Sequence, residues 1–236
     1  MDKPSRHGSV RSWLSASPLG RWRRRVRASA KTRRRLVEQA GQVERRLEIG
    51  PGPQPLKDFE TLGISDGPHV DYVLDAARLL PFGDASFDLI YASHVLEHIP
   101  WYQTDDVLRE WRRILKPGGA LEVWVPDGLK ICRTLVEFEV DGTDNTVLDG
   151  WYRMNPDKDP CRWAAGRMFT YGDGAGATDH PNWHRALFTP RFLAETLARA
   201  GFTSVRAMDR SEVRGDDHGW INLGARGVKP DEAGPA

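Results

Sequence analysis

The chain has 236 residues, of which 39% are hydrophobic and 28% are charged, so it is long enough to bury the core of one globular domain. It contains no run of about 18 apolar residues, and its charged N-terminus lacks the apolar segment of a secretory signal. Its two cysteines, Cys132 and Cys161, are too few for a disulfide framework and lack the spacing of metal ligands. The sequence therefore argues against membrane-spanning and disulfide-stabilised proteins and predicts a cytoplasmic location.

The net charge of +1 conceals an uneven distribution along the chain. Residues 1–46 hold 14 Lys/Arg against 3 Asp/Glu, whereas the remaining residues hold 20 against 30. We assign residues 1–43 to a basic N-terminal arm with a helix predicted over 19–40. Two interpretations stay open: the arm packs beside the acidic domain, or it contacts an anionic surface of nucleic acid or lipid.

Strand and helix patterns alternate along residues 44–228. Helices are predicted at 104–115 and at 190–200, the second with Thr189 as N-cap and Pro190 in its first turn. Strands are predicted at 45–50, 59–64, 70–74, 86–93, 120–125, 202–208 and 220–225. This alternation predicts an α/β fold, a doubly wound and mostly parallel seven-stranded Rossmann-like sheet with helices on both faces.

The alternation is interrupted after the fifth strand. Residues 127–185 are rich in aromatic, Asp, Gly and Pro residues, which indicates an acceptor-side insertion before the C-terminal helix, and residues 229–236 are predicted to be a disordered tail. Tyr152, Trp163, Tyr171 and Trp183 have two interpretations: they line an acceptor pocket, or they form a small core of the insertion.

In a doubly wound sheet, ligands bind beyond the carboxyl ends of the strands, so the residues just after each strand are the candidates. The first strand runs into Glu48-Ile49-Gly50-Pro51-Gly52, a turn in which glycines let a ligand approach the backbone. Pro55 stands where a dinucleotide fingerprint needs its third glycine, which argues against an NAD-dependent oxidoreductase. Asp75 follows the third strand; its carboxylate could bind a ligand or simply cap the next turn.

His94 and His98 follow the fourth strand and lie four residues apart, a spacing also found in metal sites. The His-Glu-x-x-His pattern of zinc proteases is absent, and no further ligand is evident downstream. We therefore predict no metal site. Glu97 and His98 are interpreted as a structural pair at the start of a helix.

The order of these motifs is more specific than any one of them. LEIGPG, LDAARLLPF, SFDLIYASHVLEHI, VLREWRRILKPGGALEVWVPD and HRALFTPRFLAETLARAGF together resemble class I S-adenosylmethionine-dependent methyltransferases of the type 11 group, which includes predicted methyltransferases of polysaccharide biosynthesis. The resemblance covers about residues 44–228 and implies S-adenosyl-L-methionine as cofactor. Its implied cofactor-binding residues are Glu48, Gly50 and Gly52 around the methionine part, Asp75 and Ala76 at the adenine edge, and His94 at the sulfonium end.

One position departs from the family pattern. An acidic residue at the end of the second strand ordinarily binds the ribose hydroxyls, but this chain has Gly63 there. Either Asp66 substitutes from the following loop or the ribose contacts come from elsewhere.

The predicted function is methyl transfer to a small-molecule or glycan acceptor, with O-methylation favoured. Such a hydroxyl needs a base during transfer, and the candidates, in order, are His184, His94 and His180. The alternative is a non-catalytic, degenerate methyltransferase-like protein whose basic arm binds nucleic acid or membrane.

Overall fold

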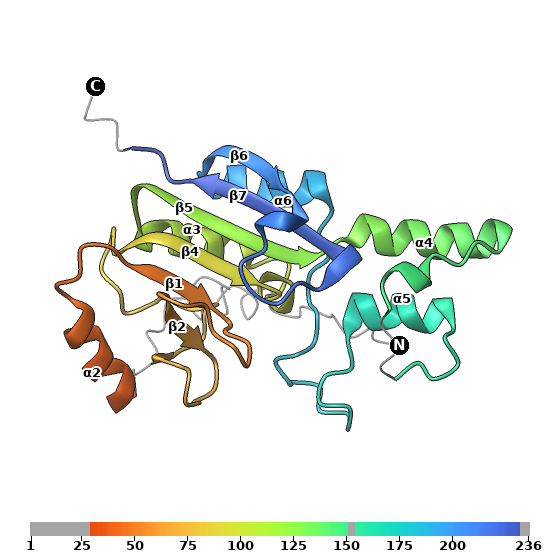
Figure 1. Cartoon of the computed structure of the whole chain (residues 1–236), viewed down its shortest axis with the longest axis horizontal. Coiled ribbons are helices and arrows are strands. Elements are labelled where there is room, and N and C mark those ends of the chain that lie inside the picture. The colour runs from red at the N-terminus through yellow and green to blue at the C-terminus, as the bar shows by residue number, and fades with distance from the viewer. Residues whose placement is uncertain (1–28, 151–153, 232–236) are drawn as a thin grey trace, which may run out of the picture.

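A seven-stranded sheet forms the centre of the protein (Figure 1), as a computed structural model describing residues 29–150 and 154–231 shows. The strand order is β3-β2-β1-β4-β5-β7-β6, with β7 antiparallel to both of its neighbours and the other pairs parallel. The strands are β1 (Arg46–Ile49), β2 (Glu60–Gly63), β3 (Tyr72–Val73), β4 (Phe87–Ser93), β5 (Leu115–Pro126), β6 (Thr203–Met208) and β7 (Asn222–Val228). All seven predicted strands are present, and the mostly parallel Rossmann-like α/β fold is confirmed.

Beta-branched and aliphatic residues fill the central strands because both faces of a parallel sheet are covered. Leu47 of β1 and Ile90 of β4 are fully buried and belong to the main core. Residues 116–119, the Lys-Pro-Gly-Gly part of the motif VLREWRRILKPGGALEVWVPD, form a bulge within β5, where pairing with β4 jumps from Phe87–Leu115 to Leu89–Ala120. Buried residues on both sides of this bulge therefore fix the register of β4 against β5.

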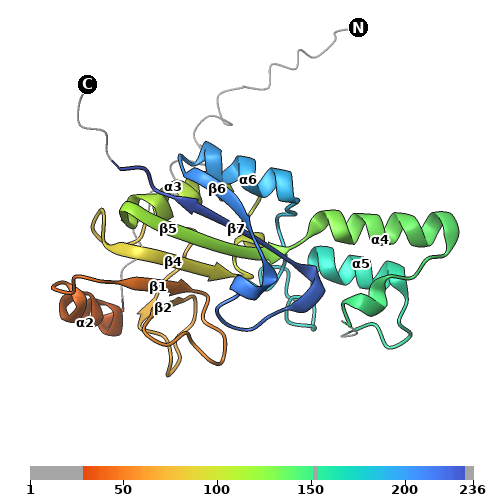
Figure 2. The same ribbon diagram turned by 45° about the horizontal axis from the view of Figure 1, so that its top comes forward.

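Two helices, α3 (Thr104–Ile114) and α6 (Pro190–Arg199), lie side by side on one face of the sheet (Figure 2). Thr189 caps α6 by accepting a hydrogen bond from the Phe192 amide, as predicted. The opposite face differs from the expectation of helices on both faces, because the described segments that join β1 to β2 and β2 to β3 contain no helix. Loop residues Leu56 and Val213 pack there against Trp124 instead.

The described part of the basic arm packs on the edge of the sheet. Helix α2 (Ala30–Gln39) contacts β3, and the Thr32 hydroxyl accepts a hydrogen bond from the Val73 amide. Lys31 pairs with Asp66 at 2.8 Å and Arg35 with Asp71 at 2.8 Å. These contacts favour the interpretation in which the arm packs beside the acidic domain; residues 19–28 of the predicted helix lie outside the described residues.

The insertion forms a helical lobe beyond the carboxyl ends of the strands (Figure 1). Helices α4 (Gly128–Asp141) and α5 (Pro160–Phe169) pack against each other, and Trp163 is buried with Ile131 in a separate small core. Trp163 therefore has the structural role of the two considered, whereas Tyr152 lies outside the described residues. At the other end of the chain, Lys229 is buried and donates to the Leu115 carbonyl at 2.8 Å, so the predicted disordered tail does not begin at residue 229. No helix in the described part of the chain has the length and apolar character needed to cross a membrane.

The burial of β4 gives a stability prediction. Ile90→Ala is expected to lower the free energy of unfolding by about 2 to 5 kcal/mol, because it removes fully buried methyl groups and leaves a cavity. Val43→Ala, at a side chain that is 87% exposed, is the control and should change stability by less than about 0.5 kcal/mol. Chemical denaturation measures both; equal effects would contradict the burial pattern.

Candidate active site

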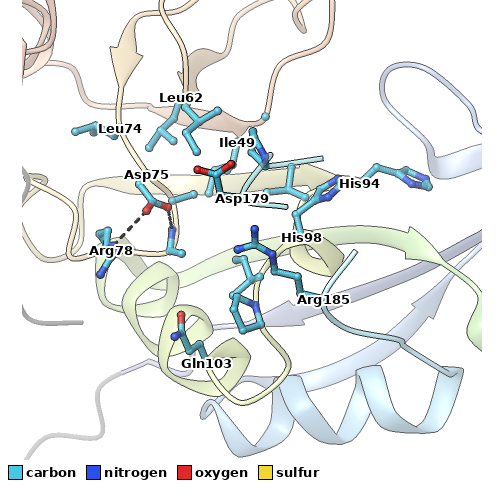
Figure 3. Close-up of a pocket in the computed structure, with 18 of the residues that line it drawn as sticks. Ile49, Leu62, Leu74, Asp75, Arg78, His94, His98, Gln103, Asp179 and Arg185 are labelled. Atoms are coloured by element: carbon cyan, nitrogen blue, oxygen red, sulfur yellow. Dashed lines mark hydrogen bonds and ion pairs between the residues drawn. The ribbon is translucent and has the colours of Figure 1, made fainter. Parts of the chain in front are cut away.

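A cleft of about 570 Å³ opens at the carboxyl ends of β1, β3 and β4 (Figure 3). This volume is in the range of small-molecule and cofactor sites. Of the sequence-predicted residues, Gly50, Asp75, Ala76 and His94 line the cleft. The fold thus brings together three motifs that are spread over 45 residues of the chain.

The glycine turn after β1 requires its first glycine. Gly50 has a φ of +74°, and a Cβ there would lie 2.3 Å from the Val95 Cγ2 atom. Gly52 has no such constraint, since the nearest atom to its Cβ position is an Asp216 carboxylate oxygen at 3.5 Å. Packing against Val95 and a positive φ therefore require glycine at position 50 but not at position 52.

Glu48 stabilises the loop that follows the glycine turn. Its side chain is buried on the face of the sheet opposite the main core and accepts a hydrogen bond from the Leu56 amide at 2.8 Å. Burial raises the pKa of the Glu48 carboxyl, which the Leu56 amide partly offsets. Neither Glu48 nor Gly52 is among the residues that line the cleft. Glu48 instead stabilises the loop after the turn through its hydrogen bond with Leu56.

The predicted adenine-edge residues follow β3. One Asp75 oxygen accepts from the Ala77 amide at 2.9 Å, and the other lies 3.2 Å from the Arg78 Nε atom. The Ala76 carbonyl accepts from the Trp111 indole at 3.1 Å, which ties this segment to helix α3. Asp75 therefore caps its turn and also faces the cleft, so the two interpretations are compatible.

The acidic residue that is missing at the end of β2 has a candidate replacement elsewhere in the cleft. Ile64, after Gly63, lines the cleft, but Asp66 points toward α2 and is held by Lys31. Asp66 is thus not the substitute that we considered. The insertion instead supplies Asp179, whose carboxylate enters the cleft between Asp75 and His94 in the view of Figure 3.

His94 ends β4 in a left-handed conformation, with a φ of +53°. Its Nε2 atom lies 2.9 Å from the Asn222 side-chain oxygen, and its Nδ1 atom lies 3.1 Å from Glu97 Oε1. Because the Asn222 amide nitrogen donates to Asp217, its oxygen accepts from the His94 Nε2 atom, while the Nδ1 atom makes an ion-pair contact with Glu97. Burial works against the charged ring, but Glu97 and Asn222 raise the pKa of His94.

His184 lies on the other side of Glu97. Its Nδ1 atom donates to the Arg167 carbonyl at 3.0 Å, and its Nε2 atom is 4.0 Å from Glu97 Oε1. Burial lowers the pKa of His184 to about 4, although the Glu97 charge acts in the opposite direction. His180, the third candidate, accepts a hydrogen bond from the Asn182 amide and so holds its own loop.

His184 lines a second cavity of about 580 Å³ that adjoins the cleft at Arg185. The other lining residues of this cavity are mostly apolar: Trp101, Met168, Phe169, Ala186, Leu187 and Phe192. Tyr171 and Trp183, which we considered as acceptor-pocket residues, are absent from this lining, and the Trp183 indole donates to the Ala177 carbonyl within the insertion. The sequence did not identify the aromatic residues that line this cavity, which are Trp101, Phe169 and Phe192.

Comparison with known proteins identifies the family of this site. Residues 33–123 match the family described as a methyltransferase domain, and the match includes Gly50, Asp75, Ala76 and His94. This part of the chain is a methyltransferase domain. The predicted class I S-adenosylmethionine-dependent family is thereby confirmed, while the polysaccharide-type qualifier stays a prediction.

The curated relatives are similar over less than half of this chain. A sterol 4-C-methyltransferase from Caenorhabditis elegans is 39% identical over 66 residues, which are 28% of this chain and 19% of that protein. The methyltransferase GfsG from Streptomyces halstedii is 41% identical over 93 residues, 39% of this chain and 29% of that protein. A solved structure of a methyltransferase from Methanosarcina mazei has 17% identity and a TM-score of 0.47, covering 84% of this chain and 98% of that chain. The chain spans less than a third of the length of these two curated relatives.

The two glycines of the turn provide a matched test of the cleft. Gly50→Ala is expected to weaken binding of S-adenosylhomocysteine at least about tenfold, because the added Cβ collides with Val95 and the positive φ is strained. Gly52→Ala should leave the affinity nearly unchanged, since its Cβ position is open. Isothermal titration calorimetry measures both; equal losses would contradict the geometry of the turn.

Proposed function

We propose that the protein transfers a methyl group from S-adenosylmethionine to an oxygen of a small-molecule or glycan acceptor. The observation that carries the proposal is the cleft itself: the matched methyltransferase segment places Gly50, Asp75 and His94 around one cavity. Gly50 lines the cleft in a turn that packing against Val95 restricts to glycine, which supports a fixed backbone conformation at this edge of the cleft. The structure does not favour the non-catalytic alternative, because the first cofactor turn is intact.

Each end of the cleft suits one part of the cofactor. The Asp75 carboxylate can accept from the adenine amino group, and the Ala76 amide can donate to a ring nitrogen. Asp179 is placed to accept from the ribose hydroxyls, replacing the acid that β2 lacks. Arg185, whose guanidinium points into the cleft in Figure 3, offers a cation for the methionine carboxylate.

When bound, the cofactor supplies a methyl group on a sulfonium, which needs no activation by the protein. The chain's own contribution is alignment of the acceptor and removal of its proton. Both ring nitrogens of His94 are engaged, Nε2 with Asn222 and Nδ1 with Glu97, so neither is free to accept a proton from the acceptor. His184 presents a lone pair on Nε2, although a pKa of about 4 makes it a weak proton acceptor.

The second cavity is the proposed acceptor site. Its aromatic lining, including Trp101, Phe169 and Phe192, provides surfaces on which a sugar or aromatic ring can stack. It meets the cofactor cleft at Arg185, so an acceptor held there can reach the sulfonium end. The relatives named as C-methyltransferases make carbon acceptors the comparison to include in any assay.

The ribose assignment has its own test. Asp179→Asn is expected to weaken S-adenosylhomocysteine binding by about 5- to 10-fold, the worth of one charge-assisted hydrogen bond partly exposed to water. Asp66→Asn is the matched control, since Asp66 pairs with Lys31 and should leave the affinity unchanged. A larger loss in Asp66→Asn than in Asp179→Asn would assign the ribose to the loop after β2.

The activity itself is tested by transfer of a labelled methyl group to panels of sugars, phenols and carbon acids. Label should appear in an oxygen acceptor and disappear with Gly50→Ala. Label in carbon acids alone would overturn the O-methylation proposal, and failure of the wild type to bind S-adenosylhomocysteine at millimolar concentration would overturn the enzyme proposal.

A further inference from the structure

We propose that Glu97, His98 and His184 bind one divalent first-row transition metal ion, such as zinc or cobalt, at the wall between the two cavities. One potential ligand atom from each of the three residues lies within 4.8 Å of the others. Two imidazoles and one carboxylate are a donor set found in metal sites that keep open positions for a substrate. The sequence did not reveal the site because its third ligand follows 86 positions after His98.

The first argument is the state of the Glu97 carboxylate. Glu97 is only 1% exposed, and neither of its carboxylate oxygens accepts a hydrogen bond from the described residues. His94 makes an ion-pair contact at 3.1 Å with Oε1 and does not reach Oε2. A buried carboxylate costs several kcal/mol unless its charge and its lone pairs are satisfied, so the half that His94 leaves open requires a partner.

The second argument is the tautomer of the two histidines. His184 donates its Nδ1 proton to the Arg167 carbonyl, and His98 places Nδ1 3.3 Å from the Trp183 carbonyl, which can only accept. In each neutral ring the lone pair is therefore on Nε2, and the His184 Nε2 atom faces Glu97 without a proton between them. A cation between them would remove this repulsion, because both the lone pair and the carboxylate could bind it. Donation of the second ring nitrogen to a backbone carbonyl is also how metal-ligating histidines are oriented.

The third argument is that the backbone builds the cluster. The Glu97 carbonyl accepts from the amides of Arg185 at 2.7 Å and Ala186 at 3.1 Å, and the His184 amide donates to the Phe169 carbonyl at 3.2 Å. These bonds fix the segment after the insertion against the end of β4. Ligands about 2.1 Å from one ion are roughly 3.4 Å apart, so side-chain rotations of about 1 Å complete the coordination.

The location suggests a use for the ion, which rests on the proposed methyl transfer. His98 lines the cofactor cleft and His184 the apolar cavity, so the open positions face both. An acceptor hydroxyl bound to the ion loses its proton to water more readily. Its oxygen then forms the bond to the methyl carbon while the carbon–sulfur bond breaks and leaves its electron pair on sulfur. This arrangement replaces the weak base His184 by a Lewis acid.

Titration of metal-free, tag-free protein with cobalt chloride tests the site through the visible absorption of the bound ion. The wild type should bind one equivalent and unfold at a higher temperature with the ion than without it. Glu97→Gln and His184→Ala should each weaken binding at least about tenfold, whereas the exposed His69→Ala is the control and should bind as the wild type does.

Absence of one-equivalent binding at micromolar cobalt in the wild type would overturn the proposal. So would equal affinity of Glu97→Gln, His184→Ala and His69→Ala. Circular dichroism identifies any variant that fails to fold, and in that case His98→Ala decides in its place. Binding of S-adenosylhomocysteine is measured on the same samples, so a failed metal site remains distinguishable from a failed cofactor cleft.

Discussion

The burial of Glu97 is the constraint on which the rest of the site depends. Its carboxylate is surrounded by the imidazoles of His94, His98 and His184, and its carbonyl holds the amides of the segment that follows the insertion. Burial alone would raise the pKa of this carboxyl, but the neighbouring His94 imidazole outweighs it and lowers the pKa. One residue just after β4 thus fixes both the electrostatics of the site and the position of the insertion.

The sheet determines where this constraint acts. Parallel strands end at one edge, so the turn at Gly50, the adenine-edge pair after β3 and the histidine after β4 converge there. The lobe of α4 and α5 lies beyond the same edge and returns to the sheet at Arg185 (Figure 1). The cofactor cleft is consequently built by the strand ends together with Asp179 and Arg185 of the insertion. The second cavity is built by the insertion, Trp101 and the residues that lead into α6.

The sequence predicted what depends on local order. Hydrophobic runs predicted all seven strands, and a cap predicted the start of α6. The order of the motifs predicted that Gly50, Asp75 and His94 line one cleft. It did not predict that Glu48 braces the turn from the opposite face, because the direction of a side chain depends on register.

Long-range pairings could not be predicted. His184 was a candidate base, but nothing in the sequence indicated that it lies beside Glu97, and Asp179 was not among the candidates for the cleft, because no periodicity reveals the path of the insertion. The missing helices after β1 and β2 were also not foreseen, since the fold class suggested helices where short loops with Leu56 cover the sheet.

A crystal structure of the protein with S-adenosylhomocysteine would show how the cleft holds the cofactor. We expect the adenine at Asp75 and Ala76, the ribose beside Asp179, and the sulfur end toward His94. A ligand that binds outside the cleft, or with its adenine at His94 and its homocysteine at Asp75, would overturn the assignment of this cleft as the cofactor site.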